Sequence, residues 1–368
     1  MKAGILTFHS TPNYGATLQC YALSGFLIGR GVDVEVINYV PLRASLAYLR
    51  LLSIGRERGI ANVRRIRAFY QFVSQRLKLS GSPMLKREQL AALGKRYDIV
   101  FTGSDEVWKV NAMRPFDPSF YLDFCDSGTT RICSYAATSS GVTDLRQFPA
   151  VAPLLTRFSS ISVRDASTAT MVKDLTGLEP QLVVDPTLLY EGWTAEDLLP
   201  LHKRGYVAVY AWLNRERMSA VRQFAAKHGL DVVCVGCRHA DADRSYLGIG
   251  PWEWLRLIKH SSLVVTNFFH GVVFALIFGR PLFTFMDRNK HIKLSSALAL
   301  ASIADRLHDS PTDLPEVGLE GCLYDVSEVH ERLRAVREES ARFVDRQLEA
   351  ASPNATPATR GRFQAEPI

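Results

Sequence analysis

The sequence predicts an α/β protein with two Rossmann-like domains facing a central cleft and a basic helical insertion in its N-terminal half. Short apolar strand-like runs alternate with helical patterns along most of the chain, which is typical of parallel sheets. The alternation stops near residue 190 and starts afresh near residue 205. The length of 368 residues is sufficient for two domains with separate cores.

The expected N-terminal domain, residues 1–190, opens with the strand AGILTF, the loop HSTPNYG and a helix in ATLQCYALSGFLIGRG. Four apolar residues of that helix share one face: Leu18, Ala22, Leu23 and Phe26. VDVEVINY is the next expected strand. Four short and largely apolar strands follow, as expected for a sheet that is covered on both faces: DIVFTG, ICSYAA, SSISVR and QLVVD.

The expected C-terminal domain, residues 205–326, has strands in YVAVYAW, DVVCVG, SLVVT and PLFTF. Helices are expected near 215–228, 252–259, 270–278 and 294–302. A long helix is predicted over 327–350, and residues 351–368 have the composition of a disordered tail. Two consecutive Rossmann-like halves place a cleft at the carboxyl ends of the strands.

The insertion, residues 42–96, has a helical pattern and carries 13 Lys and Arg against Glu57 and Glu88. The net charge of the whole chain is +7, so the remainder is slightly acidic. Two interpretations stay open: a solvated helical insertion, or a surface that steers anionic substrates or holds the protein near an anionic membrane or polymer. Nucleic-acid binding is not expected, since no recognised nucleic-acid module surrounds the segment.

Several common signals are absent from the sequence: GxGxxG after the first strand, GxxxxGK[ST], GxSxG and HExxH. NAD-linked oxidoreductases, P-loop NTPases, α/β-hydrolases and zincins are therefore disfavoured. Six scattered cysteines favour reduced thiols, and the single CxxC of Cys234 and Cys237 lacks the second pair of a zinc site. With neither a signal peptide nor a membrane span in the pattern, we expect a cytoplasmic protein, with the inner face of the membrane as a further option.

Two polar strand ends in the N-terminal domain are candidates for sugar binding. HSTPNYG contains His9, Asn13 and Tyr14 at the start of a helix, where backbone N–H groups favour an anion or a hydroxyl. TGSDEVW contains Ser104, Asp105 and Trp108. Asp105 either caps a helix or, together with Trp108, contacts a sugar.

Two further strand ends carry a cation and a histidine. In ISVRDAS, Arg164 precedes Asp165, an expected helix cap, and either clamps a phosphate or carboxylate or pairs with Asp165 or Asp185. In TNFFHGVVF, His270 and Gly271 begin a helix at the end of a strand. An apolar run around a histidine, taken alone, favours a core residue.

Six motifs, in this order, resemble those of the polysaccharide pyruvyl transferases: NYGATLQCYAL, YDIVFTGSDEVW, SYAATSSG, ISVRDASTATMVKDLTG, VVDPTLL and VVTNFFHGVVFALIFGRP. The resemblance extends from about residue 3 to 307. It implies a two-domain fold similar to GT-B glycosyltransferases. It also implies transfer of pyruvate from phosphoenolpyruvate to a pair of sugar hydroxyls, which gives a cyclic ketal and phosphate. No metal or other cofactor is implied.

The resemblance also implies roles for individual residues. Arg164 is expected on the donor phosphate or carboxylate, and His270 at the donor as an acid, with Gly271 at the helix start. The chemistry of ketal formation itself requires a base for the attacking hydroxyl, and Asp105 or His9 is expected in that role. Family members have an arginine two residues before this histidine, whereas this chain has Phe268. A second cation would then come from Lys290, Lys293 or Arg288, and acceptor contacts from His9, Asn13, Tyr14, Ser104 and Trp108.

Two alternatives remain open at the level of sequence. One is a GT-B glycosyltransferase whose nucleotide-sugar diphosphate binds the helix start at His270. The other, suggested by Phe268, is a weakly active glycan-binding relative. In the main interpretation the acceptor is a sugar or glycan of cell-surface or exopolysaccharide biosynthesis, whether free, nucleotide-linked or lipid-linked.

Overall fold

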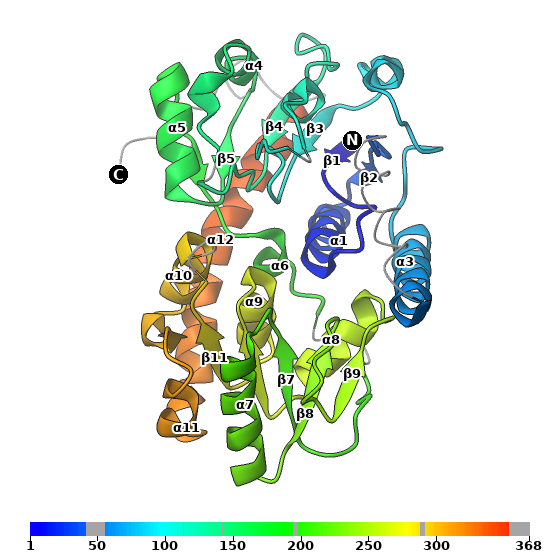
Figure 1. Cartoon of the computed structure of the whole chain (residues 1–368). Helices are drawn as coiled ribbons and strands as arrows, with labels where there is room; N and C mark the ends of the chain where they lie inside the picture. Colours follow the sequence, from blue (N-terminus) through cyan, green and yellow to red (C-terminus); the bar gives the residue numbers. More distant parts are fainter. Residues whose placement is uncertain (42–55, 113, 142, 194–197, 288–290, 353–368) are drawn as a thin grey trace. The chain divides into compact units, whose positions relative to one another are not determined.

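The computed structural model describes residues 1–41, 56–112, 114–141, 143–193, 198–287 and 291–352 (Figure 1). The chain divides into two compact units. Unit 1 contains the described residues of Met1–Ile54, Tyr70–Tyr190 and Val336–Ile368. Unit 2 contains those of Gly55–Phe69 and Glu191–Ala335. Each unit is built on its own parallel sheet.

Unit 1 has a four-stranded parallel sheet in the order β2-β1-β3-β4. The strands are β1 (Lys2–Leu6), β2 (Asp33–Val36), β3 (Ile99–Thr102) and β4 (Arg131–Ser134). A short parallel pair, β5 (Ser162–Val163) and β6 (Gln181–Leu182), continues beside β4 through isolated bridges. All four residues of β3 are buried, as expected for a strand covered on both faces.

The helices of unit 1 are α1 (Tyr14–Ile28), α4 (Val151–Leu155), α5 (Ala166–Thr176) and α6 (Pro186–Leu189). Three short 3-10 turns accompany them: η1 (Arg87–Leu93), η2 (Pro118–Tyr121) and η3 (Leu145–Gln147). Asn13 caps α1 by accepting a hydrogen bond from the N–H of Ala16. The predicted apolar face of α1 is confirmed, since its four residues are all buried.

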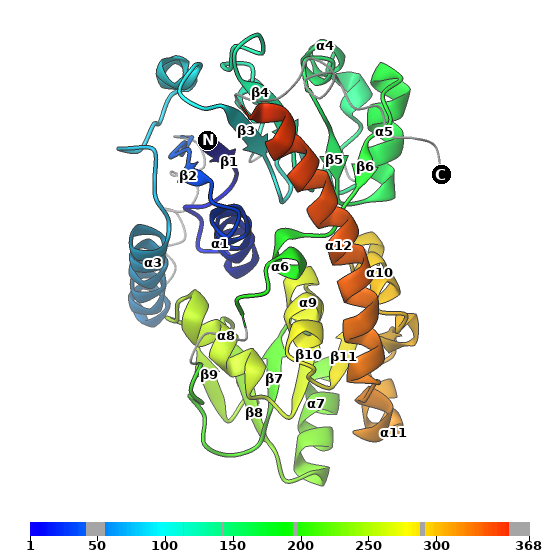
Figure 2. The same cartoon turned by 180° about the vertical axis from the view of Figure 1, so that it is seen from behind.

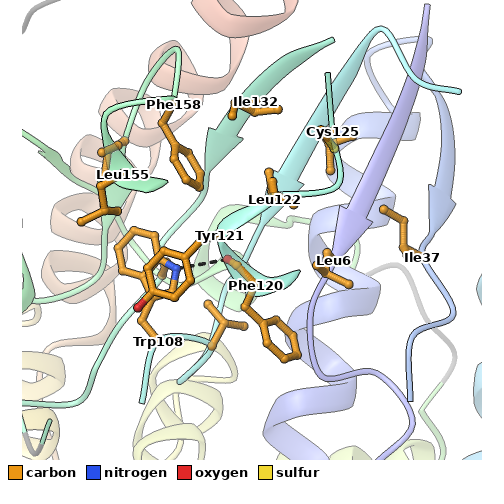
Figure 3. Packing of buried hydrophobic residues seen from close by; sticks show 14 of the residues in the cluster. Leu6, Ile37, Trp108, Phe120, Tyr121, Leu122, Cys125, Ile132, Leu155 and Phe158 are labelled. Atoms are coloured by element: carbon orange, nitrogen blue, oxygen red, sulfur yellow. Dashed lines mark hydrogen bonds between the residues drawn. The ribbon is translucent and has the colours of Figure 1, made fainter. Parts of the chain in front are cut away.

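An aromatic cluster packs against the sheet of unit 1 (Figure 3). The Trp108 ring stacks on Tyr121 with centroids 5.6 Å apart and meets Phe158 edge-on. Its indole N–H donates to the carbonyl of Phe120 at 3.2 Å. The loop after β3 therefore sends its largest side chain into the core, where the polar atom of the ring has a partner.

Unit 2 has a six-stranded parallel sheet in the order β12-β11-β10-β7-β8-β9. The strands are β7 (Tyr206–Tyr210), β8 (Asp231–Val235), β9 (Arg244–Tyr246), β10 (Leu263–Thr266), β11 (Leu282–Phe285) and β12 (Leu307–His308). The helices are α7 (Arg215–Lys227), α8 (Pro251–Lys259), α9 (Phe269–Ile277), α10 (His291–Leu300) and α11 (Asp313–Val317), with 3-10 turns η4 (Ala304–Arg306) and η5 (Glu320–Cys322). The predicted strand–helix–strand arrangement of the apolar run near residues 263–285 is confirmed.

Two long helices are shared between the units (Figures 1 and 2). Helix α3 (Arg56–Arg76) confirms a helix in the basic insertion, whereas residues 77–86 are not helical and form isolated bridges from Leu79 and Met84 to Val36 and Tyr39. Helix α12 (Val326–Ala351) confirms the predicted C-terminal helix. In unit 1, Gln347 of α12 accepts hydrogen bonds from Arg131, and the Ser340 hydroxyl accepts one from the N–H of Val184. The predicted tail beyond 352 lies outside the described residues.

None of the described helices combines the length and the apolar character that crossing a bilayer requires.

Candidate functional site

In each unit the strand order reverses at one point of the sheet. In unit 1 the chain passes from β1 outward to β2 and returns to β3 on the other side of β1. In unit 2 it passes from β7 to β8 and β9, and then to β10 on the other side of β7. Open α/β sheets bind ligands outside the carboxyl ends of the strands at such reversal points. The residues that follow β1, β3, β7 and β10 are therefore the first candidates.

After β1, the structure buries two of the three predicted acceptor contacts. His9 lies with Nδ1 3.2 Å from the carbonyl of Thr7 and Nε2 3.1 Å from Oδ1 of Asn38. Burial lowers the pKa of His9, although both hydrogen bonds oppose the shift. Tyr14 is fully buried, whereas Asn13 is exposed at the start of α1. Of these three side chains, only that of Asn13 is open to a ligand in this conformation.

After β3, the chain makes a tight turn in which Gly103 and Asp105 both have positive φ. A Cβ on Gly103 would lie 2.4 Å from the carbonyl of Tyr135, so only glycine fits there. No helix follows, and the helix-cap alternative for Asp105 is wrong: the carbonyl of Asp105 instead accepts from the N–H groups of Val107 and Thr138. Ser104 is buried, with its hydroxyl 3.1 Å from the carbonyl of Ala136.

Trp108, a predicted acceptor contact, is only 1 % exposed and belongs to the core cluster described above. Its ring has no face open to a sugar. The placement corrects the expectation, because packing on Tyr121 and Phe158 buries far more apolar surface than an exposed turn position could.

Two cations near Asp105 had no signal in the sequence. Glu106 accepts from Lys109 at 3.0 Å and from Arg114 at 3.1 Å. Burial, followed by the neighbouring Arg114, lowers the pKa of Lys109, and Asp105 partly offsets the effect. These positions are separated along an irregular loop, so no periodic pattern marks them as neighbours. The turn thus holds a half-buried carboxylate, Asp105, beside two partly exposed cations.

Arg164 forms a buried ion pair with Asp185. Its Nη1 lies 2.6 Å from Oδ2 of Asp185, and the two side chains are 8 % and 0 % exposed. Asp185 also accepts from the backbone N–H and the hydroxyl of Thr187. The ion-pair alternative for Arg164 is confirmed, with Asp185 as the partner. The pair fixes the guanidinium at the carboxyl end of β5.

Asp165 caps helix α5, as predicted. Its carboxylate accepts from the N–H and hydroxyl of Thr168 and from the hydroxyls of Ser167 and Thr138. Burial by itself would raise the pKa of Asp165, but these hydrogen bonds outweigh it and lower the pKa. Asp165 is thus a structural carboxylate that holds the start of α5 next to Arg164.

After β10, helix α9 begins at Phe269, one residue before the predicted start, so His270 is its second residue. No side chain caps this helix at Phe268. His270 is half-buried and meets the Phe269 ring edge-on at 5.0 Å. A Cβ on Gly271 would lie 2.2 Å from Oγ1 of Thr266. The glycine therefore lets the first turn of α9 pack directly on the end of β10.

The Thr266 hydroxyl cannot easily move away from a Cβ at position 271, because two hydrogen bonds hold it. The hydroxyl donates to the carbonyl of Tyr210 at 2.7 Å and accepts from the N–H of Phe268 at 3.1 Å. The same side chain thereby joins the ends of β7 and β10 to the start of α9. This junction sets the position of His270.

Phe268 is part of an aromatic cluster. Its ring centroid lies 4.8 Å from that of Tyr210 and 6.3 Å from that of Trp212. Of the predicted substitute cations, Lys293 lies on α10 and is partly buried, while Lys290 and Arg288 lie outside the described residues.

The six cysteines are free thiols, and five of them are buried. Cys237 is the partly exposed one, and its sulfur lies 3.5 Å from the carbonyl of Val209. A hydrogen bond with Cys234 lowers the pKa of Cys237. Within the described ranges, no three His, Cys, Asp or Glu side chains come together as a metal site would require.

Comparison with known proteins gives a family and a fold. A family model described as "Polysaccharide pyruvyl transferase" matches residues 13–288. No curated protein sequence matches the chain.

Two solved structures illustrate the fold. A putative UDP-N-acetylglucosamine 2-epimerase from Listeria monocytogenes has a TM-score of 0.54 at 12% identity, with 99% of each chain covered. Alr3699/HepE from Anabaena, in complex with UDP and glucose, has a TM-score of 0.51 at 10% identity, covering 95% of this chain and 98% of that one. At such identities the likeness concerns the fold alone. Together with the two parallel sheets it gives a two-domain, GT-B-like fold.

Proposed function

Because the chain belongs to the polysaccharide pyruvyl transferase family, we propose that it moves pyruvate from phosphoenolpyruvate to two hydroxyls of a sugar. The sugar belongs to a cell-surface or exopolysaccharide precursor. The observation that carries the proposal is the position of His270, half-buried in the first turn of α9 at the reversal point of the unit 2 sheet.

The reaction defines what the side chains must do. A proton is added to the methylene carbon of phosphoenolpyruvate, which makes the central carbon electrophilic. Two sugar hydroxyls form bonds to that carbon, and the C–O bond to phosphate breaks. Of the two hydroxyl protons, one makes up for the proton that was delivered to the methylene carbon, and the other leaves with phosphate. The product is a cyclic ketal.

His270 is the proton donor to the methylene carbon. Histidine is suited to this task because its unperturbed pKa is close to neutral pH. Phe268 supplies no capping side chain, and the first turn of α9 directs the N–H groups of Phe269, His270 and Gly271 towards its N-terminal end. An anionic donor at this end is stabilised by the N–H groups and by the helix dipole.

Arg164 binds an anionic group of the donor. The ion pair between its Nη1 and Asp185 fixes the guanidinium at the carboxyl end of β5, and a rigid, planar cation is suited to an anionic group. Lys109 and Arg114, both held by Glu106, are candidates for a second anionic group.

Asp105 is the base for the attacking hydroxyl. His9 was the other candidate, but it is buried, and both of its ring nitrogens face oxygen atoms of the protein. Asp105 is half-buried and lies at the reversal point of the unit 1 sheet. A carboxylate in that setting can accept a proton from a sugar hydroxyl.

Helix α3 supports association with an anionic membrane that carries a lipid-linked acceptor. Its exposed face combines apolar and basic side chains at helical spacing: Ile60, Val63, Arg64, Arg67 and Tyr70. Such a face can lie in the interface of a bilayer. Co-sedimentation should be stronger with vesicles that contain phosphatidylglycerol than with neutral ones, and Arg64→Glu/Arg67→Glu should abolish the difference. Equal sedimentation with both vesicles would contradict membrane association.

The function is tested by phosphate release from phosphoenolpyruvate with a panel of glycan acceptors. We expect release only when an acceptor is present, together with an acceptor product heavier by one pyruvyl ketal. Thermal stabilisation by UDP- or GDP-sugars but not by phosphoenolpyruvate would instead favour the glycosyltransferase alternative.

A further inference from the structure

Trp212 stands apart from the other tryptophans of the chain. Trp108, Trp193 and Trp254 are at most 1 % exposed and Trp252 is partly buried, whereas Trp212 is 70 % exposed. A single exposed apolar side chain is ordinary on a protein surface. Three further observations separate Trp212 from that ordinary case.

The first is that the backbone of Trp212 is fixed although its ring is exposed. The N–H of Trp212 donates to Oδ1 of Asn267 at 3.1 Å, and Nδ2 of Asn267 donates back to the carbonyl of Trp212 at 2.9 Å. Asn267 itself is only 2 % exposed. One buried amide thus satisfies both backbone groups of an exposed residue and fixes the point from which the indole extends.

The second observation is the position in the sheet. Trp212 follows β7, and Asn267 follows β10, so the clamp joins the two strands between which the order of the unit 2 sheet reverses. That is where ligands of open α/β sheets bind. Asn267 also lies three residues before His270, so the clamp ties the indole to the start of α9.

The third observation is a second aromatic wall. The half-buried ring of Phe268 lies 6.3 Å from that of Trp212 at an interplanar angle of 70°. Phe268 is supported in turn by Tyr210, and Tyr210 by the buried Trp254. The two rings are too steeply inclined to sandwich a flat group. They form a corner with apolar faces.

We propose that Trp212 and Phe268 form a sugar-ring subsite, in which the apolar C–H face of a pyranose of the acceptor stacks on the indole. The inference rests on the proposed function and names the part of the acceptor that the site recognises. Phosphoenolpyruvate is anionic and has no ring, so it cannot use such a corner. A pyranose has a C–H face for the indole and hydroxyls at its edge that remain available for reaction.

The kinetic test compares Trp212→Ala, Trp212→Phe and the control Leu199→Ala, which truncates another exposed apolar residue of unit 2 (60 % exposed). We expect Trp212→Ala to raise the KM for the glycan acceptor about tenfold, the scale of a lost aromatic contact, with the KM for phosphoenolpyruvate unchanged. Trp212→Phe should recover most of the loss, and Leu199→Ala should behave as wild type. An unchanged acceptor KM in Trp212→Ala would overturn the subsite.

A binding test does not depend on turnover. Acrylamide quenches exposed indoles, so Trp212 should dominate the quenchable fluorescence of the protein. A neutral glycan acceptor should protect this signal, and the protection should be absent in Trp212→Phe. If the glycan protects but no acceptor supports phosphate release, the proposed reaction fails and the subsite stands. If only uridine nucleotides protect, the subsite for sugar rings is refuted.

Discussion

Nη1 of Arg164 lies 2.6 Å from Oδ2 of Asp185, and the Asp185 side chain is completely buried. The pair thereby joins the carboxyl end of β5, which Arg164 follows, to the start of α6, which Asp185 caps. Burying two charges is favourable only when each has good partners. The hydrogen bonds from Thr187 meet that requirement for the carboxylate.

Asp185→Asn is expected to lower the free energy of unfolding by about 3 kcal/mol, since it leaves the Arg164 charge buried without its counter-ion. Urea denaturation followed by circular dichroism measures the change. Asp174→Asn, which alters an exposed carboxylate of the same unit, is the control and should change stability by less than about 0.5 kcal/mol. Equal stability of Asp185→Asn and wild type would show that the pair contributes nothing.

Arg164→Lys is expected to raise the KM for phosphoenolpyruvate about tenfold, with a smaller effect on the acceptor KM. An ammonium can stay paired with Asp185, but it cannot present a planar fork to the donor at the same time. Steady-state kinetics with each substrate varied in turn separates the two effects. Arg157→Lys is the control, because Arg157 is a partly buried arginine of the same unit that donates to the backbone carbonyls of Leu122 and Cys125. A donor KM that is the same in both variants would contradict the role of Arg164.

Gly271→Ala is expected to lower the free energy of unfolding by about 1–3 kcal/mol and to reduce turnover as well. The added methyl would lie 2.2 Å from a Thr266 hydroxyl that is already engaged, so α9 must shift and carry His270 with it. Thermal melts and turnover numbers of the same preparation test both parts. Gly29→Ala serves as the control, because a Cβ there meets no atom closer than 3.4 Å. Full activity in Gly271→Ala would show that the position of His270 does not matter.

His9 is expected to make the protein less stable as the pH falls below about 6.5. Burial holds the pKa of the folded imidazole below its ordinary value of 6.5, so the unfolded chain binds the proton first. The contribution of His9 to the free energy of unfolding is therefore fully present above pH 6.5. It decreases at lower pH, with a slope of at most about 1.4 kcal/mol per pH unit.

Urea unfolding between pH 5 and 8 measures that slope. His9→Gln should remove the contribution of His9 and leave that of His308, whose pKa is also lowered, chiefly by burial. A slope that is identical in wild type and His9→Gln would contradict the assignment.

The regular parts of the fold could be predicted because they leave local patterns. The apolar face of α1, the strand–helix–strand arrangement around His270 and the cap at Asp165 follow from side-chain periodicity and capping chemistry. The short edge strands β9 and β12 were missed, since three and two residues are too few to show a period.

The side chains on the loops could not be placed in the same way. Trp108 and Trp212 both stand at or just after a strand-like run, and no local signal separates them. Trp108 is buried because Tyr121 and Phe158 pack against it. Trp212 is exposed because Asn267 holds its backbone at the carboxyl end of β7. Both outcomes depend on residues that are distant in sequence or on hydrogen bonds made by another strand end.

The most direct test of the account compares phosphate release from phosphoenolpyruvate by wild type and His270→Ala, with the exposed His291→Ala as control. With a glycan acceptor present, we expect His270→Ala to lose about 100-fold or more in kcat, the scale of lost acid catalysis, and to melt at the same temperature as wild type. His291→Ala should match wild type in both measurements. Wild-type turnover in His270→Ala, or unfolding of that variant, would contradict the assignment of His270 as the catalytic acid.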